Sequence, residues 1–227
     1  MGTVTTLMAV SRTVLIATAT ALGAAAPALA APTLEPLQPC YVSAHTAGGY
    51  QAETVNYSGS GFTPGSMVSV SVDDRAIPAV MADAGGAISG TFFAPHARRG
   101  QMEFAVTATQ LDDPAQTAAV SSTVTNLTAS LRPGRTPPRR RVTFAGRGFT
   151  DTTAPIYAHY RLGNRTRQTV RLMGPPADPC GVFAVRRPQF PFRPRPGHWR
   201  IRIDQSRRDG AETPAVEIAI RIRRVAA

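Results

Sequence analysis

The sequence predicts an all-β protein made of two tandem β-sandwich domains, and three observations support this. The 227 residues include 20 prolines and 19 glycines, which interrupt helices and mark turns. Between them, Val, Ile, Thr and Tyr alternate with polar residues at the period of a half-buried strand, and no long window shows the 3.6-residue period of an amphipathic helix. A motif, G-x-G-F-T, occurs twice at an offset of 87 residues.

The first 30 residues have the features of a cleaved signal peptide. Arg12 supplies a positive charge, residues 14–26 form an apolar run, and Ala28 and Ala30 occupy the small-residue positions before a cleavage site. The apolar run is shorter than the roughly 18 to 20 residues that a bilayer span needs. We therefore expect export, cleavage after Ala30 and no transmembrane segment in the mature chain; an uncleaved membrane anchor is the alternative.

The mature chain aligns with itself. TVNYSGSGFT at 54–63 matches RVTFAGRGFT at 141–150, and the likeness extends into the later strands of each copy. Two tandem copies of one fold explain this self-similarity. We expect the first domain at 31–127 and the second at 128–227.

Each copy contains seven short segments with strand character. In the first domain the expected strands are 40–44, 53–60, 67–73, 76–82, 87–93, 102–110 and 118–127. In the second domain they are 127–131, 141–147, 155–161, 165–172, 181–186, 198–204 and 215–224. About seven strands in about 100 residues, with regular turn signals, is typical of an immunoglobulin-like β-sandwich.

The repeated glycines raise the question of a phosphate site. Such a site needs a strand, then the glycines, then a helix whose first amides point at the phosphate. Here strands lie on both sides, and the second copy lacks a counterpart of Gly65. We expect Gly59 and Gly61 to allow a bend at the strand end, with Phe62 packed beneath it.

The motif V-x-F-x-G-x-G-F-T behind a signal peptide resembles the immunoglobulin-like repeats of many secreted bacterial proteins. In the second copy, PIYAHYR from Pro155, PCGVF from Pro179 and RRPQFPFRPRPGHWRIRIDQ from Arg186 are similar to tandem immunoglobulin-like exported proteins of GC-rich bacteria. This resemblance covers nearly the whole mature chain and implies the fold without an activity. A weaker resemblance is to the apoproteins that carry enediyne chromophores, which have disulfides within a single domain.

The two cysteines, Cys40 and Cys180, fall one in each domain. Cysteines of an exported chain oxidise where they can meet, and their sequence separation does not prevent it. We expect an interdomain disulfide; two buried free thiols or an intermolecular link are the alternatives. Because no histidine stands at ligand spacing from either cysteine, no metal site is expected.

The positive charge is concentrated in the second domain. Residues 1–127 hold 4 arginines against 8 acidic residues, whereas residues 128–227 hold 21 arginines against 6. Strand alternation places a set of these arginines away from the core: Arg165, Arg167, Arg171, Arg200, Arg202, Arg221 and Arg223. The hypothesis is that they form one basic face.

Guanidinium groups bind phosphates, carboxylates and sulfates, so a basic face suits a polyanion. The expected partner is an anionic polymer of the cell envelope or an acidic polysaccharide, with nucleic acid as a further candidate. Two alternatives remain open: the arginines solvate the surface, or they dock the basic domain against the acidic one.

The segment 186–200 mixes arginines and prolines with aromatic residues. It is either a recognition loop or a stiff crossover between sheets whose aromatics close the core. Trp199 alternates with outward arginines, which favours its burial beside Phe190 and Phe192.

No catalytic pattern is present. The four histidines lie in unrelated contexts, and the sequence contains no HExxH, GxSxG or paired-carboxylate motif. We expect no catalytic residue, no cofactor and no enzyme activity. The sequence indicates a secreted structural or binding module of the cell envelope or extracellular space; the alternative is a carrier of a small hydrophobic ligand in a sandwich cleft.

Overall fold

The computed structural model describes residues 31–46, 49–210 and 213–223, and every regular element among them is a strand. In chain order the first nine are β1 (Thr33–Leu34), β2 (Cys40–Thr46), β3 (Gly49–Ala52), β4 (Thr54–Ser60), β5 (Met67–Val72), β6 (Arg75–Met81), β7 (Ile88–Phe93), β8 (Gln101–Gln110) and β9 (Thr117–Asn126). The others are β10 (Thr128–Arg132), β11 (Arg141–Arg147), β12 (Ile156–Leu162), β13 (Arg165–Met173), β14 (Phe183–Pro188), β15 (Gly197–Asp204) and β16 (Val216–Ile222). The expected signal peptide lies outside the described residues.

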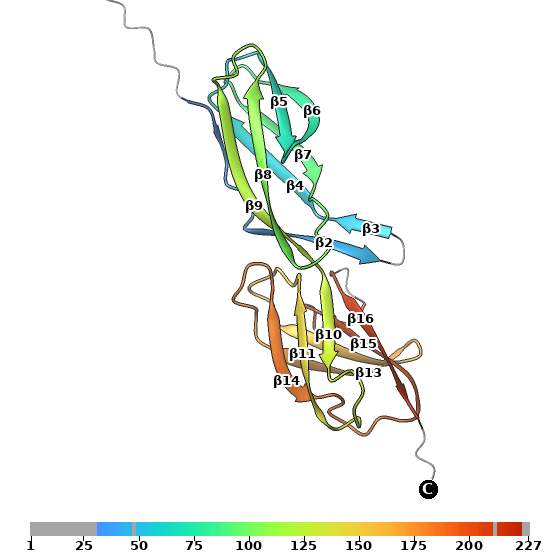
Figure 1. Ribbon diagram of the computed structural model, residues 1–227. Coiled ribbons are helices and arrows are strands. Elements are labelled where there is room, and N and C mark those ends of the chain that lie inside the picture. The colour runs from blue at the N-terminus through green and yellow to red at the C-terminus, as the bar shows by residue number, and fades with distance from the viewer. Residues whose placement is uncertain (1–30, 47–48, 211–212, 224–227) are drawn as a thin grey trace, which may run out of the picture.

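The strands form two β-sandwiches, one above the other in Figure 1. In the first, a six-stranded sheet of order β3-β2-β9-β8-β5-β6 packs on a three-stranded sheet β1-β4-β7. In the second, a four-stranded sheet β13-β12-β15-β16 packs on β10-β11-β14. Neighbouring strands run antiparallel except for the parallel pair β2 and β9. The predicted fold class, all-β with immunoglobulin-like sandwiches, is confirmed.

The expected strands match the observed ones to within a few residues, but β1 and β3 were not expected. Both are too short to show an alternating pattern: β1 has two residues and β3 has four, beginning at Gly49. These two strands are held in the sheets by pairing with longer strands, β1 with β4 and β3 with β2.

Each sandwich has its own hydrophobic core, built from the inward residues of its strands. In β4 the burial alternates residue by residue, as the period of two requires. The core of the second sandwich contains an aromatic cluster in which Phe190 and Trp199 have ring centroids 5.4 Å apart, with Phe192 and Tyr160 beside them. Trp199 is buried, and its indole nitrogen donates to Arg195 O at 2.8 Å. The 186–200 segment therefore closes the core.

The first glycine of each motif permits a close approach between strands. A Cβ at Gly59 would lie 2.6 Å from Thr33 O, and a Cβ at Gly146 would lie 2.6 Å from Thr128 O. Only a residue without a side chain fits such a distance. The two copies thus use the same close contact between the motif strand and a paired earlier strand, β1 with β4 and β10 with β11.

The second glycine of each motif turns the chain. Gly61 and Gly148 have φ of +90° and +85°, a region that side-chain-bearing residues rarely adopt. The turn directs Phe62 and Phe149 into the two cores, where each is almost fully buried. This geometry accounts for the motif as a structural corner, in line with the expectation from sequence.

Candidate functional site

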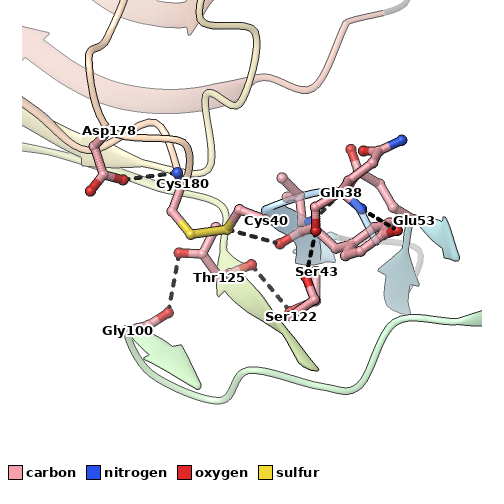
Figure 2. Close-up of a disulfide and its surroundings, with 11 residues drawn as sticks. Gln38, Cys40, Ser43, Glu53, Gly100, Ser122, Thr125, Asp178 and Cys180 are labelled. Carbon is pink, nitrogen blue, oxygen red and sulfur yellow. Dashed lines mark hydrogen bonds between the residues drawn. A yellow bond between two sulfur atoms is a disulfide. The ribbon is translucent and has the colours of Figure 1, made fainter. Parts of the chain in front are cut away.

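A disulfide between Cys40 and Cys180 joins the two sandwiches (Figure 2). Cys40 begins β2, Cys180 lies in the loop after β13, and their Cα atoms are 5.2 Å apart. Both side chains are buried. The predicted interdomain disulfide is confirmed, and because such bonds persist in oxidising compartments, it indicates an extracytoplasmic location.

A tight turn presents Cys180 to its partner. Asp178 Oδ1 accepts a hydrogen bond from Cys180 N at 2.8 Å (Figure 2). Asp178 O accepts a second one from Gly181 N, also at 2.8 Å. Gly181 has φ of +64°, and a Cβ there would overlap the backbone of Phe149. The turn therefore packs closely against the backbone of Phe149, at the G-x-G-F-T motif of the second sandwich.

The first sandwich contains the same turn. Asp83 Oδ1 accepts from Gly85 N at 2.8 Å, Gly86 N donates to Asp83 O at 3.0 Å, and a Cβ at Gly86 would overlap the backbone of Phe62. By this correspondence Cys180 occupies the place of Gly85. The disulfide is thus formed from a turn that both sandwiches contain, in which the second sandwich has Cys180 where the first has Gly85.

The chain itself makes a second connection between the sandwiches. Only Leu127 separates β9 from β10, and its N–H donates to Ser43 O at 2.9 Å. The Cβ position of Gly148 lies 2.8 Å from Leu127 Cα, so the second sandwich packs directly on this linker residue. A one-residue linker and a disulfide together restrict the angle between the sandwiches.

The structure separates the arginines that were predicted to share one face. Register shifts in the pairing of β12 with β13 place Arg165 opposite Leu162 and leave Arg167 between the pairs formed by its neighbours. Arg171 instead pairs with Tyr157 on the outer face. All three side chains are exposed, but bulges in β13 interrupt the alternation on which their common face was predicted.

Arg200, Arg202 and Arg221 do project from the outer face of the sheet β13-β12-β15-β16, as Arg171 does, and Arg223 follows the end of β16. Acidic residues share this face. Glu217 Oε1 lies 3.1 Å from Arg161 Nη1, and its Oε2 lies 3.7 Å from Arg200 Nη1.

Arg202 is more deeply engaged than Arg200. Its Nε lies 2.9 Å from Asp204 Oδ2 and 3.9 Å from Asp209 Oδ1, and its side chain is only 16% exposed, against 59% for Arg200. Asp209 also lies 3.5 Å from Arg161 Nε. The centre of the predicted basic face is therefore a balanced ion-pair network.

A buried histidine anchors this network. His159 and Asp204 are both fully buried, with His159 Nε2 3.0 Å from Asp204 Oδ1 and 3.0 Å from Ser206 O. Since both neighbours are acceptors, Nε2 carries the proton and donates. Thr169 Oγ1 lies 2.9 Å from the other ring nitrogen, Nδ1.

Burial raises the pKa of Asp204, but the hydrogen bonds from His159, Ser206 N–H and Arg202, with the attraction of His159, outweigh it, and the net pKa is lowered. A hydroxyl, a histidine and an aspartate hydrogen-bonded in this order resemble a catalytic triad. Here the imidazole and carboxylate are fully buried and no substrate can reach them. The arrangement therefore stabilises the turn after β15. Sequence reasoning missed this pair because the two residues are 45 positions apart.

A different group of arginines has no carboxylate partner among the residues that the structure describes. The register of the sheet β10-β11-β14 places Arg132, Thr143 and Arg186 side by side on its outer face, and Arg141 begins β11 beside them. The loop from β10 to β11 contributes three more. We call this set the arginine surface: Arg132, Arg135, Arg139, Arg140, Arg141 and Arg186, all exposed.

The ion pairs of the described residues use only Arg161, Arg200 and Arg202 among the arginines. The backbone beneath the arginine surface is ordered by hydrogen bonds: Gln189 N donates to Arg140 O, and Phe190 N donates to Pro138 O, each at 2.8 Å. The arginine surface thus combines uncompensated charge with a fixed backbone.

Two grooves complete the candidate sites. One, of about 540 Å³, lies between the sandwiches and includes Glu53 and Arg202 in its lining. The other, of about 1030 Å³, lies in the first sandwich along β6 and β7 and includes Phe92 and the 74% exposed Phe93. In the described part of the chain, no three His, Cys, Asp or Glu residues are grouped to hold a metal ion.

Comparison with known proteins adds little to these observations. No family model and no curated protein matches the sequence. A crystal structure from Corynebacterium diphtheriae, named "Putative membrane anchored protein", is similar over 85% of this chain, with 10% sequence identity and a TM-score of 0.33. The chain spans 57% of the length of that structure. Within the described residues, no helix is long and apolar enough to cross a membrane.

Proposed function

We propose that the protein is an extracytoplasmic, non-enzymatic binding module that holds an anionic polymer through the arginine surface. The observation that carries the proposal is the presence of six exposed arginines, on and beside one three-stranded sheet, without a carboxylate partner among the described residues. Several guanidinium groups fixed on strands bind a repeated anion cooperatively, with an affinity that falls steeply as salt rises.

The contrast between the two sheets of the second sandwich favours binding over simple solvation. On the sheet of β12, β15 and β16, three arginines at the centre of the outer face, Arg161, Arg200 and Arg202, are matched by Glu217, Asp204 and Asp209. Arg171 and Arg221, nearer the edges of this sheet, take part in no ion pair among the described residues. On the sheet β10-β11-β14 no such match occurs among the described residues. An arginine content set by composition alone gives no reason for this division between the two faces.

The position of the arginine surface argues against docking onto the first sandwich. Arg132 ends β10 and Arg141 begins β11, and this end of the sheet points away from the first sandwich in Figure 1. The acidic residues of the first sandwich therefore cannot neutralise it within one chain. The disulfide supports a partner outside the cytoplasm, such as an envelope polymer or an acidic polysaccharide.

The test is retention of the mature chain on a sulfated polysaccharide, on purified cell envelope and on DNA across a salt series. The variant Arg132→Gln/Arg141→Gln/Arg186→Gln should elute at clearly lower salt from the matrix that retains the unmodified chain. Its salt dependence should also be shallower, because a protein with fewer arginine–anion contacts releases fewer counterions on binding. The matched control is Arg75→Gln/Arg98→Gln/Arg99→Gln, which removes three exposed charges from the first sandwich. Equal retention of both variants would contradict the proposal, and retention on DNA alone would replace the polysaccharide with nucleic acid.

A second candidate function, carriage of a small hydrophobic molecule, is favoured by the groove along β6 and β7. Its volume of about 1030 Å³ is sufficient for a drug-sized ligand, and Phe93 lies in its wall with most of its ring exposed. An aromatic fluorescent dye should then bind with a saturable signal that Phe93→Ser abolishes. A dye signal that is unchanged in Phe93→Ser would eliminate this candidate.

A further inference from the structure

The groove between the sandwiches has walls from both of them. Val42 of β2 and Ala52 of β3 contribute small apolar side chains from the first sandwich, and Pro214 and Ala215 contribute them from the second. Leu127, the linker residue, also lines it. The two covalent connections described above restrict the separation of these walls, so the groove is largely preformed.

Three charged side chains line this groove, and two of them are neutralised. Glu217 is paired with Arg161 and Arg200, and Arg202 is paired with Asp204 at 2.9 Å. They therefore contribute little net charge to the groove.

Glu53 has no cationic partner among the described residues. It is half-buried on the same side of the junction as Cys40, and its Oε2 accepts a hydrogen bond from Val42 N at 2.8 Å (Figure 2). Burial raises its pKa, an effect that the hydrogen bond from Val42 only partly opposes. The groove therefore contains one uncompensated carboxylate beside apolar walls.

We propose that this groove binds an organic ammonium ion with a compact apolar body. The ammonium group would lie at the Glu53 carboxylate, and the alkyl part would pack on Val42, Ala52 and Pro214. A cation restores the favourable interaction that the carboxylate loses when water is excluded. An anion would have to displace the carboxylates from Arg202, and a neutral molecule would leave Glu53 uncompensated.

The volume of about 540 Å³ and the position at a domain interface are those of a small-molecule site. This proposal is independent of the polymer-binding proposal, since the groove and the arginine surface share no residue. The triple arginine-surface variant should accordingly bind the ammonium probe as the unmodified chain does.

The experiment is an NMR titration of the mature chain with n-butylammonium, and with 1-butanol and butyrate as neutral and anionic probes of similar size. We expect saturable amide shifts at Val42, Ala52 and Leu127 with butylammonium, and at least tenfold weaker binding of the other two. Glu53→Gln should weaken butylammonium binding about tenfold, because the amide oxygen still accepts from Val42 N while the charge is lost. The matched control, Glu103→Gln, changes an exposed carboxylate of β8 and should have no effect.

The pH dependence provides a separate readout. Butylammonium binding should weaken as the pH falls through the pKa of Glu53, which lies above the ordinary 4.5, and Glu53→Gln should lose this dependence. Three results would each overturn the proposal: no localised shifts with butylammonium, equal affinity for 1-butanol, or unchanged affinity in Glu53→Gln.

Discussion

The two sandwiches present equivalent faces with different chemistry. In the first, Ser71, Thr107 and Ala119 form one outward row across β5, β8 and β9; in the second, His159, Arg202 and Glu217 form the corresponding row across β12, β15 and β16. The first row is neutral, and the second is charged with Arg202 paired to Asp204 and Glu217 paired to Arg161 and Arg200. The comparison teaches that arginines at the centre of a face can be neutralised by acidic residues that the fold brings beside them.

The other sheet of each sandwich shows the opposite outcome. Asn56 and Thr91 pair across β4 and β7, and at the corresponding places Thr143 and Arg186 pair across β11 and β14. No acidic residue accompanies the arginines on this face among the described residues. The arginines of this face therefore have no ion-pair partners among the described residues, whereas Arg161, Arg200 and Arg202 of the other face do, although the strands and corners of the sandwiches correspond.

The largest loss of stability is expected from substitutions in the turn that the two sandwiches share, at Gly86 in the first and Gly181 in the second. Gly181→Ala places a Cβ on the backbone of Phe149 at a φ of +64°, and we expect a loss of about 4 kcal/mol in the free energy of unfolding. Gly86→Ala should have the same effect on the first sandwich. The measurement is denaturant unfolding followed by tryptophan fluorescence for the second sandwich and by circular dichroism for both.

The control for the turn is Gly163→Ala. Gly163 has a similar φ of +60° but nothing within 4 Å of its Cβ position, so only the backbone strain of about 1 kcal/mol is expected. If Gly181→Ala cost no more than Gly163→Ala, the close contact with the Phe149 backbone would not be the reason for glycine in the turn.

The next effect concerns the residue by which the two turns differ. The variant Cys40→Ala/Cys180→Gly gives the second turn the glycine that the first has at Gly85, while removing the interdomain disulfide. We expect a loss of about 3 kcal/mol in unfolding free energy, and calorimetry should resolve separate transitions for the two sandwiches. A single transition at the original temperature would show that the packing at Leu127 alone couples them.

A smaller effect is expected at the buried pair that only the second sandwich has at this position. Asp204→Asn removes the charge that faces His159 and Arg202, and should cost about 2 kcal/mol at neutral pH. Because the folded pKa of Asp204 is lowered below 3.8, its contribution is present above that pH and is lost as the pH falls through the folded pKa. The difference between wild type and variant should therefore shrink in acid.

The matched control for this pair is Asp112→Asn, at an exposed aspartate in the loop between β8 and β9 of the first sandwich. Denaturation curves from pH 7 to pH 2.5 measure both variants. A constant difference for Asp204→Asn over this range would contradict the assignment of the effect to the carboxylate charge.

Local alternation in the sequence was sufficient to predict all the strands except the short β1 and β3, and also the burial of Trp199, because these depend on the period of two. It was not sufficient for the candidate site. The bulges in the pairing of β13 move Arg165 and Arg167 without any local sign. Glu217, the partner of Arg200, comes from β16, and Asp209, the second partner of Arg202, comes from the turn after β15, so these contacts depend on tertiary structure. Asp204, the nearest partner of Arg202, is only two residues away on β15.

The smallest expected effect tests that last point directly. Arg200 is 59% exposed and its Nη1 is 3.7 Å from Glu217 Oε2, so Arg200→Gln should change the unfolding free energy by no more than about 0.5 kcal/mol. It should also change polymer retention far less than Arg186→Gln, since Glu217 already offsets part of its charge. If Arg200→Gln instead lowered retention as much as Arg186→Gln, the ion-paired face would contact the polymer too, and the division between the two faces would lose its functional meaning.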